Sequence, residues 1–132
     1  MGAWGHGSFE NDSALDWTEN SFKRGGAAAV DAALRHAAES AEDAYLDVDE
    51  ASAAVAAAEF VAAARDGDLS KLDSLQNDFA AHRQSLTSPH LVALARQALE
   101  RVLRNSELQE LWGEGQDKSW LNEMSNLLTR LR

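Results

Sequence analysis

The sequence predicts an all-α protein folded as a single compact bundle of five to six helices. Apolar residues recur at the three-and-four spacing that places them on one face of a helix. No stretch alternates apolar and polar residues with β-branched side chains, as a strand does. The length of 132 residues is that of one domain, so we expect residues 1–132 to share one core.

The first third of the chain predicts two helices and a loop. The first, short helix starts at one of three capping residues, Asn11, Asp12 or Ser13, and ends at the pair Gly25 and Gly26. The second helix has an apolar face made of Val30, Ala33, Leu34, Ala37, Ala38 and Ala41. The segment AYLDVDE, residues 44–50, breaks this spacing and predicts a loop.

The rest of the chain predicts further helices separated by glycine and proline. An alanine-rich helix over residues 50–65 can be buried around most of its circumference, and Gly67 ends it. A more polar helix is indicated by the spacing of Leu69, Leu72, Leu75 and Phe79. Ser88 and Pro89 suit the cap and first turn of a helix with an apolar stripe over 91–103. A short helix over 106–112 and a last helix over 120–131 follow.

Composition excludes several classes of protein. The 22 acidic and 12 basic residues give a net charge of −10, which repels phosphate backbones and favours a basic partner over a nucleic acid. No apolar run is long enough to span a bilayer and the start lacks the pattern of a signal peptide, so we expect a cytoplasmic protein with no membrane partner. Because the chain has no cysteine, disulfides, thiolate zinc sites and cysteine nucleophiles are excluded.

The first seventeen residues, MGAWGHGSFENDSALDW, combine glycines, aromatic residues and acids. The glycines allow an extended N-terminal arm, residues 1–10, to turn tightly and pack on the bundle. Alanine side chains let helices approach closely, so larger side chains are needed to fill the remaining volume. We therefore expect Trp4, Phe9 and Trp17 to plug the bundle.

This N-terminal motif resembles the opening of a bacterial family known as domain-of-unknown-function family 4259. The similarity continues in SAAVAAAEFVAAARDG and in LVALARQALERVLRNSELQELWGE with the WL that follows. Together these segments cover about two-thirds of the chain, and residues 68–86 lie outside the resemblance. The resemblance implies one compact domain with a structured N-terminus, and it implies no activity.

Six residues are candidates for a binding site: Trp4, Phe9, Asp12, Asp16, Trp17 and Glu59. Helix capping explains acids near a first turn, so a structural role is favoured over a binding role for Asn11 and Asp12. Asp16 and Trp17 lie beyond the cap and are the better candidates for binding. An aromatic wall beside carboxylates is the arrangement that a binding site here would use.

Glu59 is a carboxylate on an otherwise apolar helix, so it lies either on a narrow exposed strip or is buried with a partner. Expected partners are backbone N–H groups of the N-terminal arm, His36, or an arginine such as Arg96 or Arg101. We expect a structural pin that holds the arm in preference to a catalytic role, since ion-pair networks also place acids inside proteins.

Motifs for catalysis are absent from the sequence. It has no Gly-x-Ser-x-Gly, Walker, Glu-x-x-His or His-Glu-x-x-His pattern. His36 and Glu39 precede a run of acids, but a solvated acidic face explains them better than a metal site does. We therefore predict no catalytic residue, no metal and no cofactor, and whether the protein is an enzyme stays open, with a non-enzyme favoured.

The leading hypothesis is a small acidic protein-interaction or regulatory module that binds another protein, with a basic partner as one option. Masking of a basic partner, as immunity proteins mask nuclease toxins, is one form of it. The alternative is a small-ligand-binding protein or enzyme with its site between the N-terminal arm and the helix that carries Glu59. An oligomeric role through the stripe 91–103 or the last helix is a third hypothesis, and the sequence leaves the oligomeric state open.

Overall fold

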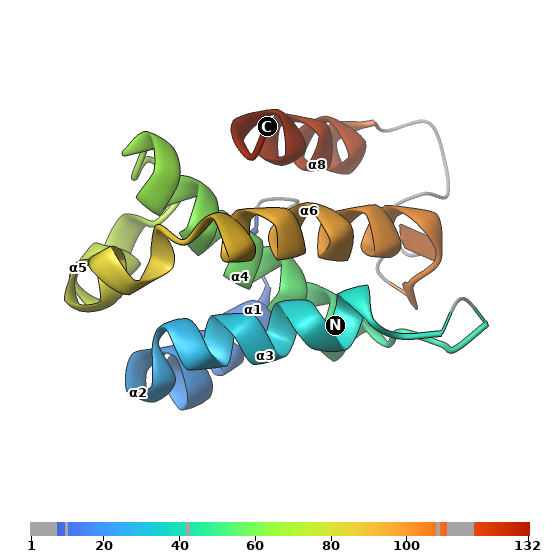
Figure 1. Ribbon diagram of the computed structural model, residues 1–132. Helices are drawn as coiled ribbons and strands as arrows, with labels where there is room; N and C mark the ends of the chain where they lie inside the picture. The colour runs from blue at the N-terminus through green and yellow to red at the C-terminus, as the bar shows by residue number, and fades with distance from the viewer. Residues whose placement is uncertain (1–7, 10, 42, 108, 111–117) are drawn as a thin grey trace.

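The described part of the protein is all-α, which confirms the predicted fold class. A computed structural model describes residues 8–9, 11–41, 43–107, 109–110 and 118–132, and these contain helices and no strand (Figure 1). Trp4 and the rest of segment 1–7, together with Glu10, lie outside the described residues. The predictions for Trp4 and for the larger part of the N-terminal arm therefore stay predictions.

The central element is α4, Val48–Asp66, the predicted alanine-rich helix. Every residue from Ala51 to Ala64 except Ala53 is buried, because small side chains let neighbouring helices approach it from several sides. The helix begins two residues earlier than predicted. Asp47 caps it through a reciprocal capping box with Glu50, with Asp47 Oδ1 2.8 Å from the Glu50 nitrogen and Glu50 Oε1 3.2 Å from the Asp47 nitrogen.

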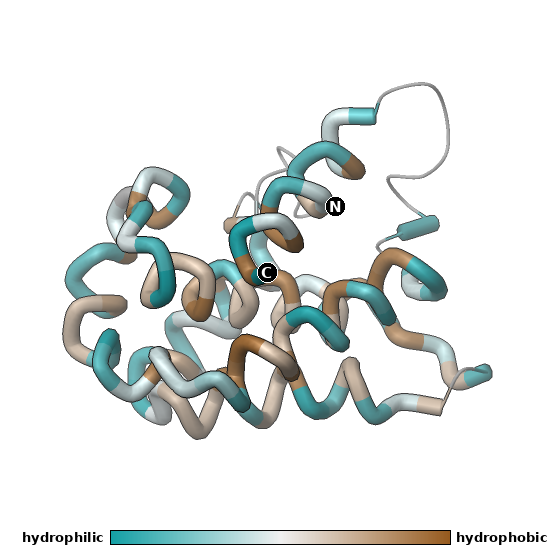
Figure 2. The backbone as a smooth tube through the Cα atoms, turned by 45° about the horizontal axis from the view of Figure 1, so that its top comes forward, coloured by the Kyte–Doolittle hydropathy of each residue, from teal (hydrophilic) through white to brown (hydrophobic). Residues whose placement is uncertain are grey.

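Two further helices complete the main layer around α4. The helix α3, Ala27–Ala38, and the helix α6, Pro89–Arg104, pack against α4 and against each other. Ser88 caps α6 and Pro89 occupies its first turn, as predicted. In Figure 1, α6 lies between α3 and the last helix, α8, Ser119–Arg130. Along these helices apolar positions recur between polar ones, so each turns one face to the core (Figure 2).

The apolar stripes of α6 and α8 are buried within the chain. Leu91, Leu94, Leu99 and Val102 of α6 are at most 5% exposed, and Trp120, Met124 and Leu127 of α8 are at most 3% exposed. Core packing therefore accounts for both stripes, which the sequence alone left open as surfaces for oligomerisation.

The first predicted helix is a continuous run of three parts: α1, Asp12–Trp17, a π-helical turn, Thr18–Phe22, and α2, Lys23–Gly25. Asn11 is its cap, with Oδ1 accepting a hydrogen bond of 2.7 Å from the Ala14 nitrogen. The π turn was not predicted. It brings Trp17 and Phe22, five residues apart, to the same side of the run, with ring centroids 6.0 Å apart.

The segment predicted as one polar helix over Leu69–Phe79 is broken into short pieces. A 3₁₀ turn, Asp73–Leu75, precedes α5, Gln76–His82, and a second 3₁₀ turn, Arg83–Leu86, follows it. Of the apolar positions identified in the sequence, Leu72 and Phe79 are buried and Leu69 and Leu75 pack partly buried against the core. Leu86, in the second 3₁₀ turn, is also buried. In the predicted short helix over 106–112, residues 107 and 109–110 are helical, and Leu108 and the residues from Leu111 lie outside the described residues.

Aromatic side chains fill the space between the N-terminal run and α4. Phe60 of α4 lies at the centre: its ring centroid is 3.9 Å from that of Phe22, 5.0 Å from Phe9, 6.1 Å from Phe79 and 6.2 Å from Trp17. Phe9 is 8% exposed and Phe22 and Phe60 are fully buried. Phe9 and Trp17 therefore pack on the alanine-rich helix, in agreement with the expectation that aromatic residues complete its packing.

Gly26, between α2 and α3, occupies a conformation that requires glycine. Its φ is 54° and its ψ is −125°, and a Cβ at this position would lie 2.3 Å from Nδ1 of His82. We expect Gly26→Ala to lower the free energy of unfolding by about 2–4 kcal/mol, because backbone strain and a clash add together.

Chemical denaturation measures the free energy of unfolding of Gly26→Ala, with Gly67→Ala as the control variant. Gly67, which ends α4, also has a positive φ of 75°, but a Cβ there would meet its nearest neighbour, Arg83, at an ordinary 3.6 Å. The Gly67 variant should lose only about 1 kcal/mol. Equal losses in the two variants would contradict the role given to His82.

Candidate functional site

Glu59 is buried, and the described part of the chain gives it two partners. Its side chain is 3% exposed, accepts a hydrogen bond of 3.1 Å from Ser8 Oγ, and forms an ion pair with Nη1 of Arg130. Ser8 belongs to the N-terminal arm and Arg130 ends α8. The carboxylate therefore joins the arm and the last helix to α4. This is the geometry of the predicted pin.

An arginine was among the predicted partners of Glu59 and Arg130 takes that place, but the side chains named as candidates have other environments. His36 contacts Glu50 instead. Arg101 is 1% exposed and donates to the backbone oxygens of Ala41 at 3.1 Å and Ala44 at 2.6 Å, as well as to that of Asn105. Its guanidinium thus ties the loop after α3 to α6. Arg96 is exposed and makes no ion pair within the described residues. From the described part of the N-terminal arm, Ser8 contributes its hydroxyl, and the expected backbone N–H groups of residues 1–7 lie outside the described residues.

Arg130 also joins α8 to the end of α4. Its Nε lies 2.8 Å from Oδ2 of Asp66, and its Nη2 lies 3.2 Å from Oδ1 of Asp66 and 3.2 Å from the backbone oxygen of Asp68. Burial raises the pKa of Asp66, but hydrogen bonds from Arg130 and from the Asp68 nitrogen outweigh it, and the pKa of Asp66 is lowered. Burial opposes the charge of Arg130, yet Asp66 and Glu59 raise its pKa, so the guanidinium stays charged.

The lowered pKa of Asp66 predicts a loss of stability in acid. Since the pKa is lower in the folded than in the unfolded protein, ionised Asp66 stabilises the fold above about pH 4, and this contribution is lost as the pH falls through the folded pKa. At pH 7, Asp66→Asn should lower the free energy of unfolding by about 1 kcal/mol. Urea denaturation of the two proteins should show the difference shrinking below about pH 4.

The matched control compares Arg130→Met with the double variant that carries both Arg130→Met and Asp66→Asn. Without the guanidinium, the hydrogen bond from the Asp68 nitrogen remains, so Asp66→Asn should change the pH dependence of stability less than it does in the wild type. A difference between wild type and Asp66→Asn that stays constant down to about pH 2 would contradict the prediction.

The candidate residues do not converge on one site. Phe9 and Glu59 lie in the core, with Glu59 already occupied by its two partners. Asp12 and Asp16 are exposed on α1, and Trp17 is half-buried. Of these five residues, Trp17 lines one of the described cavities.

Trp17 forms one wall of a groove of about 420 Å³ between the N-terminal run, α3 and α4. We call it the Trp17 groove; its described lining consists of Trp17, Ser21, Ala29, Ala32, Ala33, His36, Glu50 and Ala53. An indole wall, an alanine floor and a few polar groups are features of sites that bind apolar side chains or small ligands.

A histidine and a glutamate lie together in the lining of this groove. Nε2 of His36 contacts Oε2 of Glu50 in a hydrogen bond. Burial raises the pKa of Glu50, but the hydrogen bonds from His36 and from the Asp47 nitrogen outweigh it, and the pKa of Glu50 is lowered. The sequence offered His36 and Glu39 as a candidate metal pair, but the spacing of the residues did not indicate that His36 pairs with Glu50. Within the described residues no group of three or more histidine and acidic side chains could hold a metal ion.

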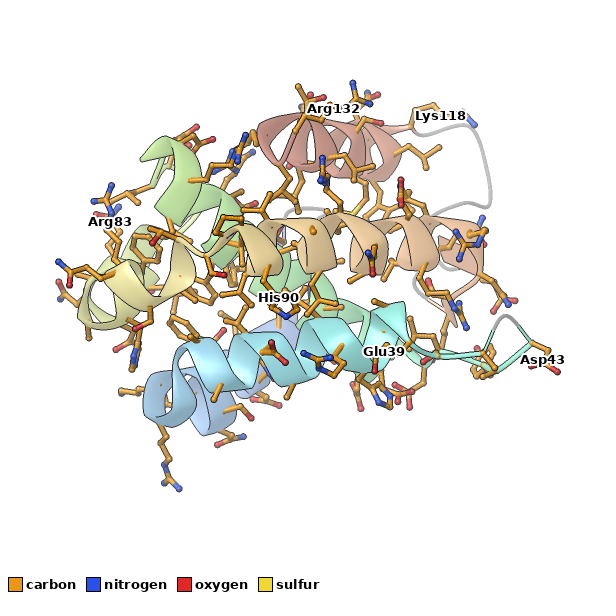
Figure 3. The ribbon with its side chains drawn as sticks, viewed as in Figure 1. Glu39, Asp43, Arg83, His90, Lys118 and Arg132 are labelled. Atoms are coloured by element: carbon orange, nitrogen blue, oxygen red, sulfur yellow. The ribbon has the colours of Figure 1, made fainter. Side chains whose placement is uncertain are left out.

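The charge of the protein is divided unequally along the chain. Residues 1–68 carry 14 acidic and four basic side chains, and residues 69–132 carry eight of each, so the net charge of −10 belongs to residues 1–68. We call these residues the acidic half. They supply every described lining residue of the Trp17 groove. Figure 3 shows Glu39 and Asp43 at the end of α3 and in the loop after it, whereas Lys118 and Arg132 lie beside α8, across the molecule.

Exposed acids lie on two of the elements that line the Trp17 groove, the N-terminal run and α4. Asp12, Asp16 and Glu19 follow one another at helical spacing on the N-terminal run, and all three are exposed. Asp49 of α4 is exposed and accepts a hydrogen bond of 2.6 Å from Ser13 Oγ, which places the acids of α4 next to those of α1. Glu19 pairs with Lys23 at 3.6 Å, but acids outnumber basic side chains on the elements that line the groove.

These observations define an all-α protein that carries an apolar groove in an acidic half. The chain belongs to the family described as Domain of unknown function (DUF4259), which matches residues 2–123. This confirms the resemblance inferred from the N-terminal motif and the two later segments. No curated protein and no solved structure matches the chain. No helix in the described part of the chain is long and apolar enough to cross a membrane.

Proposed function

We propose that this protein is a protein-interaction module of the cytoplasm whose acidic half binds a basic segment of another protein. In this proposal the Trp17 groove receives one apolar side chain of that segment. The observation that carries it is the coincidence of the groove with residues 1–68, which hold the whole net charge. Masking a basic partner, as immunity proteins mask nuclease toxins, is the specific form that we favour.

Charge and groove have different roles in this proposal. Acids around the groove attract a basic partner over distances of about 10 Å and speed its association, an effect that salt weakens. Exposed charge pairs add little affinity of their own. Most of the binding energy should come from burial of an apolar side chain against the Trp17 indole, because buried aromatic contacts dominate protein interfaces.

A peptide selection tests the proposal and does not require the identity of the partner. A library of random twelve-residue peptides is selected for binding to the wild-type protein and counter-selected against Ala32→Gln. Ala32 is an exposed lining residue of α3, so a glutamine there obstructs the groove without entering the core. The expected peptides are net basic and share one large apolar residue.

Fluorescence anisotropy then measures each selected peptide against matched variants. Ala32→Gln and replacement of the apolar peptide residue by serine should each weaken binding about tenfold or more. Ala28→Gln, at an exposed position of α3 outside the groove lining, should leave binding within about twofold. Selected peptides that are acidic, that lack an apolar residue in common, or that bind Ala32→Gln as well as wild type would contradict the proposal.

A second candidate function, binding of a small ligand, uses the same groove. The pair His36 and Glu50 would hold a polar group of the ligand, and the indole and alanines would hold its apolar part. The predicted alternative places such a site between the N-terminal arm and the helix that carries Glu59, and this second candidate instead uses the Trp17 groove between the N-terminal run, α3 and α4. Small aromatic fragments that bind wild type and not Ala32→Gln, together with failure of the peptide selection, would favour this candidate.

A further inference from the structure

We propose a second binding site, for a small amphipathic carboxylate, in a pocket on the other side of the molecule. The pocket has a volume of about 400 Å³ and lies where the end of α4, the start of α6 and the end of α8 meet. We call it the arginine pocket, because Arg65, Arg96 and Arg132 line it. It shares no lining residue with the Trp17 groove, and the proposal is independent of the proposed function.

The inner wall of the arginine pocket is apolar. Ala64 and Val92 are each 8% exposed and Leu131 is fully buried. These three side chains come from the three helical segments that meet at the pocket, so the apolar surface is a product of the fold. A ligand with an apolar body gains free energy when that body leaves water and packs on this wall, at about 25 cal/mol per Å² of apolar surface buried.

The rim of the pocket is cationic, and its guanidinium groups have donors to spare. Within the described residues, neither Arg96 nor Arg132 forms an ion pair, whereas Arg35 pairs with Asp31 and Arg130 with Glu59. Arg65 donates through Nη2 to the backbone oxygen of Arg132, and a guanidinium has four further N–H donors. Three cations around one hollow are unusual in a protein with a net charge of −10, and they make this hollow a site for an anion.

The donors and the apolar wall together select a carboxylate with an apolar tail. The planar guanidinium fork matches the two oxygens of a carboxylate. Thr87 at the rim donates its hydroxyl hydrogen to the Gln84 backbone oxygen at 3.0 Å, so the arginines are the side chains that donate to the ligand. A free inorganic anion would leave the apolar wall uncovered.

Isothermal titration calorimetry with octanoate tests this inference. Octanoate should bind with a 1:1 stoichiometry, and hexanoate should bind about tenfold more weakly, because it buries two fewer methylene groups. Octanol has the same tail without the charge, and inorganic phosphate has the charge without a tail. Both should bind at least tenfold more weakly than octanoate.

Variants at exposed arginines locate the site. Arg96→Gln should raise the Kd for octanoate about tenfold, since it removes a charge-assisted contact without touching the core. Arg24→Gln is the matched control, because Arg24 is exposed on α2 in the acidic half and should leave the Kd within about twofold. The inference is overturned if octanoate does not bind, if octanol or phosphate binds as tightly, or if Arg96→Gln leaves the Kd unchanged.

Discussion

Phe60→Ala is expected to lower the free energy of unfolding by about 3–5 kcal/mol, the range of large-to-small changes in a well-packed core. Phe60 is fully buried, and its ring lies within 6.2 Å of four other aromatic rings, centroid to centroid. These neighbours come from the N-terminal arm, the N-terminal run and α5, so a cavity at Phe60 removes contacts that three segments share. Urea denaturation followed by circular dichroism measures the change.

Two control variants test whether the loss of stability depends on the buried position of Phe60 and not simply on the removal of an aromatic ring. Tyr45→Ala removes a ring that is 62% exposed and should change the free energy of unfolding by less than about 0.5 kcal/mol. Phe60→Leu retains most of the buried volume and should cost clearly less than Phe60→Ala. A loss below about 1 kcal/mol for Phe60→Ala would show that the aromatic cluster does not organise the core.

Arg130→Met should have a comparable effect, about 3–5 kcal/mol, for an electrostatic reason. The substitution retains an apolar side chain of similar length but leaves the carboxylate of Glu59, 3% exposed, without its counter-ion. Removing one member of a buried ion pair costs more than removing both, because the remaining charge is buried without compensation. Thermal and urea denaturation of the single variant give the size of the loss.

A double-mutant cycle isolates the pair. Glu59→Gln alone should destabilise less than Arg130→Met, because Arg130 retains Asp66 as a partner. The double variant should be less destabilised than the sum of the two single variants, by about 1–3 kcal/mol. Arg24→Met, at an exposed position, is the control and should be close to wild type. Strictly additive losses would contradict a direct coupling between Glu59 and Arg130.

Much of the helical architecture could be predicted from local patterns. Helix α6 was predicted from Ser88, Pro89 and its leucine stripe, and the structure has these features in the same roles. Helix α4 was predicted from its alanines, with a start two residues too late because the capping role of Asp47 was not identified. Capping and spacing act within a few residues, so one sequence is enough to recognise them.

The irregular elements could not be predicted in this way. The π turn at Thr18–Phe22 accompanies a stack of Phe22 on Phe60, a contact between residues far apart in the chain. Likewise, residues 73–86 adopt short 3₁₀ and α pieces that place Leu72, Phe79 and Leu86 in the core. Tertiary packing determines both the π turn and the short helical pieces, and the local helix propensity of these residues does not indicate either.

The candidate site was predicted in part. Trp17 and Glu59 were selected because an aromatic residue beyond a cap and an acid on an apolar helix are unusual, and the structure gives each a distinct environment. The ion pair of Glu59 with Arg130 could not be predicted, because the two residues are 71 apart in the sequence. The same holds for the pair of His36 and Glu50 in the Trp17 groove, which are 14 apart. The unequal charge of the two halves was available from the sequence, and counting acids by segment would have indicated the acidic half.

The central claim is that the Trp17 groove in the acidic half takes the apolar side chain of a basic segment. Two-dimensional ¹H–¹⁵N NMR tests it most directly, with a selected peptide titrated into the labelled protein and the Trp17 indole signal assigned through Trp17→Phe. We predict that the largest shifts fall on the Trp17 indole N–H and on the amides of the lining residues of α3 and α4. Shifts confined to α6 and α8, with the Trp17 indole signal unchanged at saturation, would contradict the account.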